Sequence, residues 1–293
     1  MNRFLMATLC VASLALGSCT SHGPSAPAPQ VPQRIISVVP SATEMLFAFG
    51  LADRVIAVGD YDELPPGYEG KPRIGGLLNP NIEKIIEYKP DLVITYGSQE
   101  ILRDRMKELG IRIYPFTHGS ISQTLDYMVA LGRTVGAEDK AREIEQRIRM
   151  TFDEIRKQAP VKHPTVLLVH DRGVGALGSF YSVGGKAFQN ELIEIAGGEN
   201  IFSDVDKEVM QPSIEAIMKR APEIIIETLP SGLPDQEAER RKSDWNKLAK
   251  VPAVMNKRVF IVGEDYMLVP GPRLDLAAKK FAEVIETFGR NEK

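Results

Sequence analysis

The sequence predicts an α/β protein of two lobes, each with a mainly parallel central sheet, bridged by one long α-helix. Short β-branched runs alternate with helical stretches in both halves of the chain, which is typical of parallel sheets covered on both faces. The segments NPNIEKIIEYKPDLVITY (79–96) and QPSIEAIMKRAPEIIIET (211–228) match without a gap, sharing Pro, Ile-Glu, Ile, Pro and Ile at equivalent positions. This near-duplication favours two lobes over the alternative of one continuous doubly wound domain.

The first half begins with IISVV (35–39), an apolar and β-branched run that predicts a buried strand. A helix follows, with Ser41 or Thr43 as its N-cap and Gly50 as its stop. The residue before a proline disfavours helix, so the next helix should end before Pro90. Further strands are expected at 55–59, 91–96 and 111–116, and further helices at 81–89 and 99–109.

Between the halves, residues 120–158 are expected to be helical almost throughout. The strongest part is 137–158, where apolar residues recur at steps of three and four and predict one buried stripe with a charged outer face. The stripe consists of Ala141, Ile144, Ile148, Phe152 and Ile155. A helix of about 20 residues is roughly 30 Å long, so it would connect the lobes stiffly.

The second half repeats the alternation. Strands are expected at 165–171, 223–228 and 258–265, with a further short strand within 179–185. Helices are expected at 186–197, 214–221, 244–250 and 274–288.

The N-terminus has the layout of a secretory signal. One Arg precedes an apolar core from Phe4 to Leu16, which is too short to span a membrane, and small residues follow. The end, Leu-Gly-Ser-Cys19, resembles the lipobox of bacterial lipoproteins, in which the Cys becomes the lipidated first residue. The alternative is that Cys19 is an incidental thiol. The other cysteine, Cys10, lies in the part that would be removed, so the mature domain would contain no disulfide.

Residues 20–33, TSHGPSAPAPQVPQ, are rich in proline and predict an extended tether that holds a folded domain away from a membrane surface. The expected organisation is therefore a lipoprotein signal peptide (1–19), a Pro-rich tether (20–33), an N-terminal α/β lobe (34–136), a bridging helix (137–158) and a C-terminal α/β lobe (159–293). Such a protein would be exported and lipid-anchored at the cell envelope, on its periplasmic or extracellular face.

Composition and motifs exclude several functions. A net charge of −3 without a run of Lys or Arg argues against nucleic-acid binding. The sequence contains no G-x-S-x-G, G-K-[ST] or H-E-x-x-H motif, so no catalytic residue is assigned. Gly173, Gly175 and Gly178 form a G-x-G-x-x-G, but SFYSVGG separates them from the next helix, whereas a dinucleotide fingerprint opens a helix directly.

Residues at the carboxyl ends of the strands are the candidates for ligand contact, because ligands of open α/β sheets bind at that edge. They are Asp60, Tyr61, Tyr96, His118, His170, Asp171, Glu227, Thr228, Asp265 and Tyr266. Aromatic and polar groups with few basic ones suit a large, partly apolar ligand. A trianionic siderophore would be expected to meet Arg or Lys instead, for which Arg172 and Arg273 are the candidates.

Three strand-end groups raise the alternative of a metal site. His118, His170 and Asp265 are of the types that bind transition metals, but they are far apart in the sequence. The competing interpretation is that the histidines are polar loop residues that bond backbone. No resident metal or cofactor is assigned.

The duplicated segments each place a glutamate in the first turn of a helix. Asn81 and Ser213 are good N-cap residues, and Glu83 and Glu215 follow them by two positions. An acid there is stabilised by the helix dipole by about 0.3–1 kcal/mol, which is a sufficient reason for one such residue. Two at matching positions would be related by an approximate two-fold axis, and would suit docking to a partner that is itself a homodimer.

Several blocks together resemble the substrate-binding proteins of bacterial ABC importers for vitamin B12, haem and iron-siderophores. They are RIISVVPSATEMLFAFGLADRVIAVGDYDELPP, GGLLNPNIEKIIEYKPDLVITY, AGGENIFSDV and GPR, and the similarity covers about 34–290. Among the subfamilies, the DYxxLPP, NPNIEKI…KPDLV and AGGENIF blocks are most similar to vitamin B12-binding proteins.

The resemblance implies two α/β lobes bridged by a helix, with cargo held between them and delivered to a dimeric permease driven by paired ATPases. It implies permease-docking roles for Glu83 and Glu215, which correspond to the family's salt-bridging glutamates. It places family cleft positions at Tyr61, Leu77, Tyr96, His170 and Asp265, to which Tyr266 is added as a strand-end neighbour. Positions that carry Trp in vitamin B12 binders are Leu77 and Tyr96 here, and the sole Trp, Trp245, is expected on an outer helix.

The sequence therefore predicts an exported, lipid-anchored substrate-binding protein for a corrinoid, and not an enzyme. The transported ligand would be a cobalt corrinoid or an iron chelate. Haem, with a Tyr or His170 as axial ligand, and a ferric siderophore are the alternatives within the class. A bare metal-ion receptor and a lipid-anchored α/β enzyme that uses the same strand-end crevice are the alternatives outside it.

Overall fold

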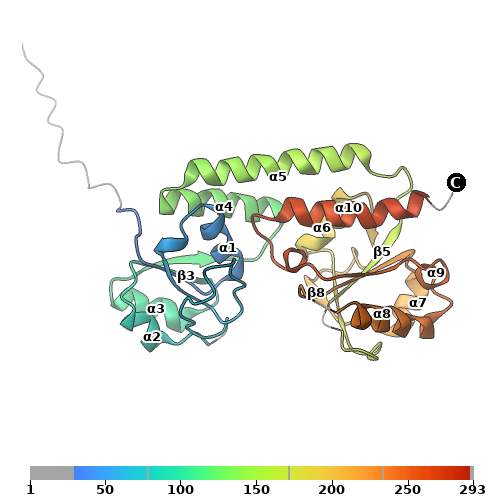
Figure 1. The fold of residues 1–293 in the computed structure, drawn as a ribbon, viewed down its shortest axis with the longest axis horizontal. Helices are drawn as coiled ribbons and strands as arrows, with labels where there is room; N and C mark the ends of the chain where they lie inside the picture. The colour runs from blue at the N-terminus through green and yellow to red at the C-terminus, as the bar shows by residue number, and fades with distance from the viewer. Residues whose placement is uncertain (1–29, 78, 171, 233, 291–293) are drawn as a thin grey trace, which may run out of the picture. The chain divides into compact units, whose positions relative to one another are not determined.

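Two separate β-sheets form the centres of two α/β lobes, which confirms the predicted fold class (Figure 1). The computed structural model describes residues 30–290 except 78, 171 and 233. From Val31 onward the chain forms one compact unit that contains both lobes.

The sheet of the N-terminal lobe has the order β2-β1-β3-β4, and all its strand pairs are parallel. Its strands are β1 (Ile35–Ser37), β2 (Val55–Val58), β3 (Leu92–Tyr96) and β4 (Arg112–Phe116). The central strand β1 is buried along its whole length, as expected for a parallel sheet covered on both faces.

The sheet of the C-terminal lobe has the order β10-β9-β5-β6-β8, and β7 also pairs with β5. Its strands are β5 (Thr165–His170), β6 (Tyr181–Val183), β7 (Glu199–Asn200), β8 (Val209–Met210), β9 (Ile224–Thr228) and β10 (Val259–Val262). The pairs β5–β6 and β6–β8 are antiparallel, and the other pairs are parallel. The short strand expected within 179–185 is β6.

The helices of the N-terminal lobe are α1 (Pro40–Ala48), η1 (Ala52–Arg54), α2 (Ile82–Glu87), α3 (Glu100–Glu108) and α4 (Ile121–Val135). The predicted cap of α1 is wrong. Its N-cap is Val39 in an extended conformation, and Ser41 and Thr43 lie buried inside the helix. Pro40 explains the difference, because its fixed φ and missing N–H suit the first helical position.

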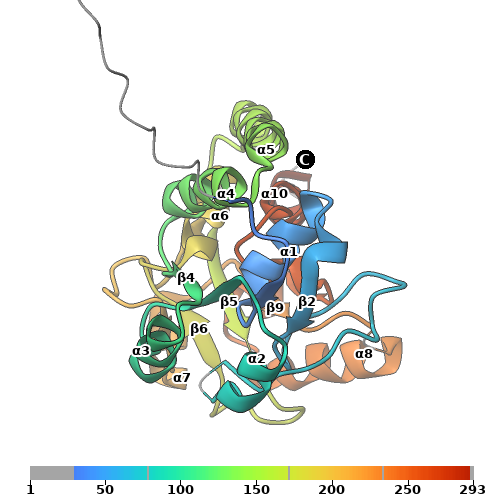
Figure 2. The same cartoon turned by 90° about the vertical axis from the view of Figure 1, so that its left-hand side faces the viewer.

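Residues 120–158 are helical almost throughout, as predicted, and form two helices with a short break between them. Gly136 adopts a left-handed conformation (φ 73°) and ends α4, after which α5 (Glu138–Gln158) begins. The predicted apolar stripe of α5 is buried, and α5 packs on α4 and on α10 (Leu274–Arg290). Figures 1 and 2 show α5 running along one side of both lobes.

The remaining helices of the C-terminal lobe are α6 (Phe188–Ile195), α7 (Ile214–Arg220), α8 (Asp235–Asp244), η2 (Trp245–Leu248), α9 (Pro252–Met255) and η3 (Asp265–Met267). Helix α8 was not predicted, because its sequence DQEAERRKSD has no apolar stripe. Its buried residue is Arg241, so it is held by charge rather than by apolar packing.

The second face of the C-terminal sheet has its own core around Trp245. This side chain is fully buried with Leu167, Val169, Ile225 and Phe180. Trp245 does lie on a helix outside the sheet, η2, as expected, but its side chain points into the core.

The duplicated segments adopt the same local structure in both lobes. The side chains of Asn81 and Ser213 cap α2 and α7 by accepting hydrogen bonds from backbone N–H groups three residues on, as predicted. After each helix a non-glycine residue, Lys89 or Ala221, has the left-handed φ of 46° and precedes a proline and a strand. The repeat therefore extends from the sequence to an uncommon backbone conformation.

Candidate ligand site between the lobes

Aromatic side chains gather at the strand ends of the N-terminal lobe. The rings of Tyr96, the last residue of β3, and His118, just after β4, are stacked with centroids 5.2 Å apart and planes at 22°. Phe116 packs edge-on against both rings. Tyr61, after β2, is 68% exposed and lies against the backbone of Gly76. This edge therefore offers ring faces to a ligand.

The residue after Tyr61 is a buried acid, Asp62, whose charge acts on Tyr96. Asp62 is 4% exposed, and neither of its carboxylate oxygens accepts a hydrogen bond from the described residues. Burial raises the pKa of Asp62 to about 6. Burial, with a smaller contribution from Asp62, also raises the pKa of Tyr96 to about 12, so the phenol stays protonated. Nothing in the sequence distinguished Asp62 from its exposed neighbours.

His170 ends β5 on the other lobe and is enclosed. Its Nδ1 is hydrogen-bonded to the hydroxyl of Thr228 at the end of β9. Its Nε2 is buried without a hydrogen-bond partner among the described residues. Burial lowers the pKa of His170 to about 4, so the imidazole is neutral. In this conformation neither nitrogen is open to a metal.

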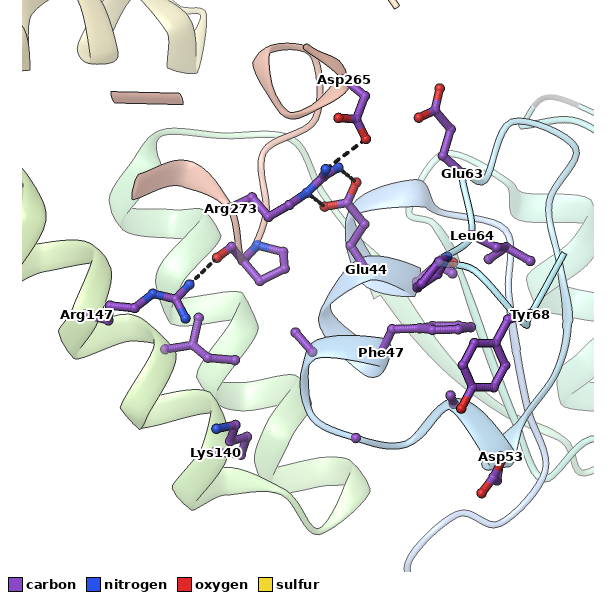
Figure 3. Close-up of a pocket in the computed structure, with 17 residues that line it drawn as sticks. Glu44, Phe47, Asp53, Glu63, Leu64, Tyr68, Lys140, Arg147, Asp265 and Arg273 are labelled. Atoms are coloured by element: carbon purple, nitrogen blue, oxygen red, sulfur yellow. Dashed lines mark hydrogen bonds and ion pairs between the residues drawn. The ribbon is translucent and has the colours of Figure 1, made fainter. Parts of the chain in front are cut away.

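Asp265 lies on the wall of a cavity of about 770 Å³ that is lined by both lobes and by α5 (Figure 3). Its carboxylate pairs with Arg273 at 2.8 Å, and Arg273 also pairs with Glu44 of α1 at 2.7 Å. Tyr266, half-buried, has its ring centroid 5.8 Å from the Arg273 guanidinium. Arg273 is thus the cleft cation that the sequence suggested, although two carboxylates already neutralise it.

Glu227 and Arg172 do not line the cleft, contrary to expectation. Both are fully buried and pair at 2.9 Å, and Arg172 also meets Asp244 at 2.8 Å. Glu227 further pairs with Arg241 at 2.9 Å and accepts a hydrogen bond from Trp245 at 3.2 Å. The strand-end rule failed here because β9 turns Glu227 toward α8, where the ionic network replaces an apolar contact.

The other strand-end candidates have varied surroundings. Leu77 is half-buried, and its carbonyl accepts a hydrogen bond from the Gln99 side chain. Asp60 is exposed and accepts a hydrogen bond from the Gly75 N–H at 3.2 Å. Asp171 and the lipidation candidate Cys19 lie outside the described residues.

The glycine-rich stretch 173–178 forms turns and not the start of a helix. The N–H of Gly175 donates to the carboxylate of Asp244 at 2.6 Å, and the next helix, α6, begins at Phe188. A phosphate at these glycines would therefore meet an occupied N–H group and no helix N-terminus.

Each of the three groups considered for a metal site contacts a different residue instead. His118 stacks on Tyr96, His170 is hydrogen-bonded to Thr228, and Asp265 pairs with Arg273. Within the described ranges, no cluster of three or more His, Cys, Asp or Glu side chains could hold a metal ion.

None of the described helices combines the length and the apolar character needed to cross a membrane.

Glu83 and Glu215 are exposed at the second position of α2 and α7. The pKa of Glu215 is lowered by hydrogen bonds from its own backbone N–H and the Ser213 side chain, which favours the charged form. In both views α2 and α7 lie on the side of the unit away from α5 (Figures 1 and 2).

Two α/β lobes, a long helix that packs on helices of both, and a cavity lined by residues of both lobes define a two-lobe α/β protein of the binding-protein type. The chain belongs to the periplasmic binding protein family, whose sequence pattern matches residues 35–266. Its general function is therefore the binding of a substrate for transport rather than catalysis.

Relatives of known name agree with this assignment. The chain is 30% identical over 268 residues to YvrC of Bacillus subtilis, named an uncharacterized ABC transporter substrate-binding lipoprotein, covering 88% of this chain and 82% of the relative. It is 27% identical to the vitamin B12-binding protein of Vibrio cholerae, covering 82% and 84%. The crystal structure of the periplasmic vitamin B12-binding protein BtuF of Vibrio cholerae matches with a TM-score of 0.72 and 25% identity, covering 87% of this chain and 97% of that one.

Proposed function

We propose that this protein captures a corrinoid between its lobes and delivers it to the permease of an ABC importer. The observation that carries the proposal is the nature of the strand-end edge. Tyr61 and the Tyr96–His118 stack offer aromatic faces. The Nδ1 of His170 is hydrogen-bonded and its Nε2 is buried, and burial raises the pKa of the Tyr96 phenol to about 12. Such an edge suits a macrocycle that is held by stacking and by hydrogen bonds at its periphery.

Cobalamin fits this requirement because both axial positions of its cobalt are filled within the molecule. Ferric haem would gain from a protein axial ligand. A phenol with a pKa of about 12 resists becoming a phenolate, and the nitrogens of His170 are enclosed. The relatives named as vitamin B12-binding proteins support the same choice.

Haem is the second candidate, because Tyr61 and His118 are exposed at this edge and could supply an axial ligand. A ferric siderophore is favoured less, since Arg273 is already paired with Glu44 and Asp265.

The delivery step is assigned to the paired glutamates. Glu83 and Glu215 are exposed on helices with equivalent side-chain N-caps, one in each lobe, on the side away from α5. A homodimeric permease with its ATPases, which presents two equivalent sites, is the partner that such a pair would fit. Attachment of a lipid to Cys19 would keep the protein at the membrane that holds this permease.

The visible absorption spectrum tests the ligand. The purified protein would be incubated separately with cyanocobalamin, haemin and a ferric siderophore, and then separated from free ligand by gel filtration. We expect one equivalent of cyanocobalamin to co-elute, chemically unaltered. Stoichiometric retention of haemin with a shifted Soret band, and none of cyanocobalamin, would contradict the corrinoid assignment. Conversion of the ligand would indicate an enzyme instead.

A further inference from the structure

The loop that carries Asp265 is fastened to the opposite lobe by an ion pair. Glu44 of α1 binds Arg273 through two contacts, Oε1 to Nη2 at 2.7 Å and Oε2 to Nε at 3.1 Å. The remaining nitrogen, Nη1, lies 2.8 Å from Asp265. Figure 3 shows Arg273 between the two carboxylates. Glu44 of the N-terminal lobe fixes the Arg273 guanidinium in a bidentate geometry. Through Arg273 it orients Asp265 of the C-terminal lobe.

The same loop has a second anchor that does not touch Arg273. Arg147 of α5 donates to the carbonyl of Pro272 at 2.7 Å and pairs with Asp275 at 3.1 Å. The two anchors therefore differ in what they do. Both hold the loop in place, but the Glu44 anchor alone also neutralises the guanidinium beside Asp265.

Burial makes this neutralisation strong. The side chain of Glu44 is 15% exposed, and burial raises its pKa even though Arg273 lowers it. Glu63 lies nearby on the cavity wall, where burial and the neighbouring Asp265 raise its pKa. The three cations on the same wall are already paired: Arg273 with Glu44 and Asp265, Arg147 with Asp275, and Lys140 with Glu143. A cargo group that enters here therefore meets hydrogen-bond acceptors, and none of these cations is left unpaired for an anion.

We propose that Glu44 is a positioning residue that sets cargo selectivity: by occupying Arg273 across the lobe boundary, it presents Asp265 to amide N–H donors and rejects carboxylates. This inference rests on the proposed function and adds the chemical class of the periphery that is recognised. Corrinoids carry neutral carboxamides around the ring, whereas haem carries two propionates. The selectivity comes as much from the neutralisation of Arg273, which leaves it unavailable to a carboxylate, as from the acceptor oxygens of Asp265.

The test compares two corrinoids that differ in one group. Dissociation constants would be measured for cyanocobalamin and, separately, for its monocarboxylic acid derivatives, in which one propionamide is hydrolysed. We expect the parent protein to prefer the amide over at least one of the acids by about tenfold or more. Glu44→Gln, which removes one of the two carboxylates that neutralise Arg273, should reduce that ratio about fivefold or more, whereas Glu44→Asp should retain most of it.

Asp275→Asn is the matched control, because it weakens the other anchor without removing a carboxylate from Arg273. It should leave the ratio within about twofold of the parent even where it lowers thermal stability. A ratio that is unchanged in Glu44→Gln, or equally reduced in Asp275→Asn, would overturn the inference. If Glu44→Gln does not fold, the same affinity ratio is compared between Glu44→Asp and Asp275→Asn. A larger reduction of the ratio in Asp275→Asn than in Glu44→Asp would overturn the inference. Failure of the parent to bind either corrinoid would contradict the proposed function itself.

Discussion

The two lobes contain the same helix-to-strand unit and differ at the strand-end edge, where we propose that the ligand binds. In both, a capped helix with a first-turn glutamate leads through a left-handed residue into a buried strand, β3 or β9. At the end of β3, Tyr96 stacks on His118 beside a buried acid with no hydrogen bond among the described residues. At the end of β9, Glu227 is locked in an ionic network and Thr228 holds His170.

This contrast separates two demands on the molecule. Helices α2 and α7 repeat each other, which suits a partner with two equivalent sites. The strand ends do not repeat, which suits a cargo whose two faces differ. The N-terminal lobe presents aromatic ring faces at its strand ends, whereas the C-terminal lobe buries the polar groups there. We therefore expect substitutions at the two edges to change the free energy of unfolding by different amounts.

The largest expected effect is in the C-terminal lobe. Glu227→Ala leaves the buried Arg172 and Arg241 without their shared carboxylate, and loss of one partner of a buried ion pair costs about 3–5 kcal/mol. Urea denaturation would measure this loss in the free energy of unfolding. Tyr61→Ala in the N-terminal lobe, at a 68% exposed side chain, should change it by less than about 0.5 kcal/mol. Equal losses in the free energy of unfolding for the two variants would contradict the contrast between the buried strand ends of the C-terminal lobe and the exposed ones of the N-terminal lobe.

An intermediate effect is expected from the buried acid of the N-terminal lobe. The pKa of Asp62 is raised from 3.8 to about 6, so between these values the folded state binds more protons than the unfolded state. The contribution of Asp62 to stability therefore falls as the pH rises from about 4 to 6, by at most about 3 kcal/mol. Denaturation of Asp62→Asn and the parent at pH 4 and 7 should show the variant gaining relative to the parent at the higher pH. A pH-independent difference would be inconsistent with a buried, unpaired carboxyl.

The smallest effect tests the repeat itself. Lys89 and Ala221 both have a φ of 46°, which costs a residue with a Cβ about 1–2 kcal/mol relative to glycine. Because glycine also loses more entropy on folding, Lys89→Gly and Ala221→Gly should each stabilise the protein by about 0.5–1 kcal/mol. Thermal unfolding of both variants would show whether the gains are similar. Destabilisation of one and stabilisation of the other would mean that the two turns are not equivalent.

Much of the fold could be predicted because its signals are local. The strands are apolar runs, the caps Asn81 and Ser213 are polar residues before helical spacing, and the stripe of α5 is periodic. Helix α8 and the burial of Trp245 could not be predicted, because a charged helix that is held by buried ion pairs has no periodic apolar signal.

The candidate site was predictable only in part. The strand-end rule indicated Tyr96, His170 and Asp265, but not which way each side chain turns, and so it wrongly included Glu227. The roles of Asp62 and Glu44 depend on burial and on a contact 229 residues apart in the chain, neither of which a sequence pattern records.

The division between a paired docking side and an unpaired cargo edge is tested most directly by Glu83→Ala combined with Glu215→Ala. Uptake of labelled cobalamin by cells and the dissociation constant of the purified protein would be measured together, with Glu87→Ala, an exposed acid at the other end of α2, as the control. We expect the double variant to lose uptake while its affinity stays within about twofold of the parent, and the control to keep both. Uptake by the double variant at the level of the parent, or a loss of affinity that accounts for its lost uptake, would contradict the account.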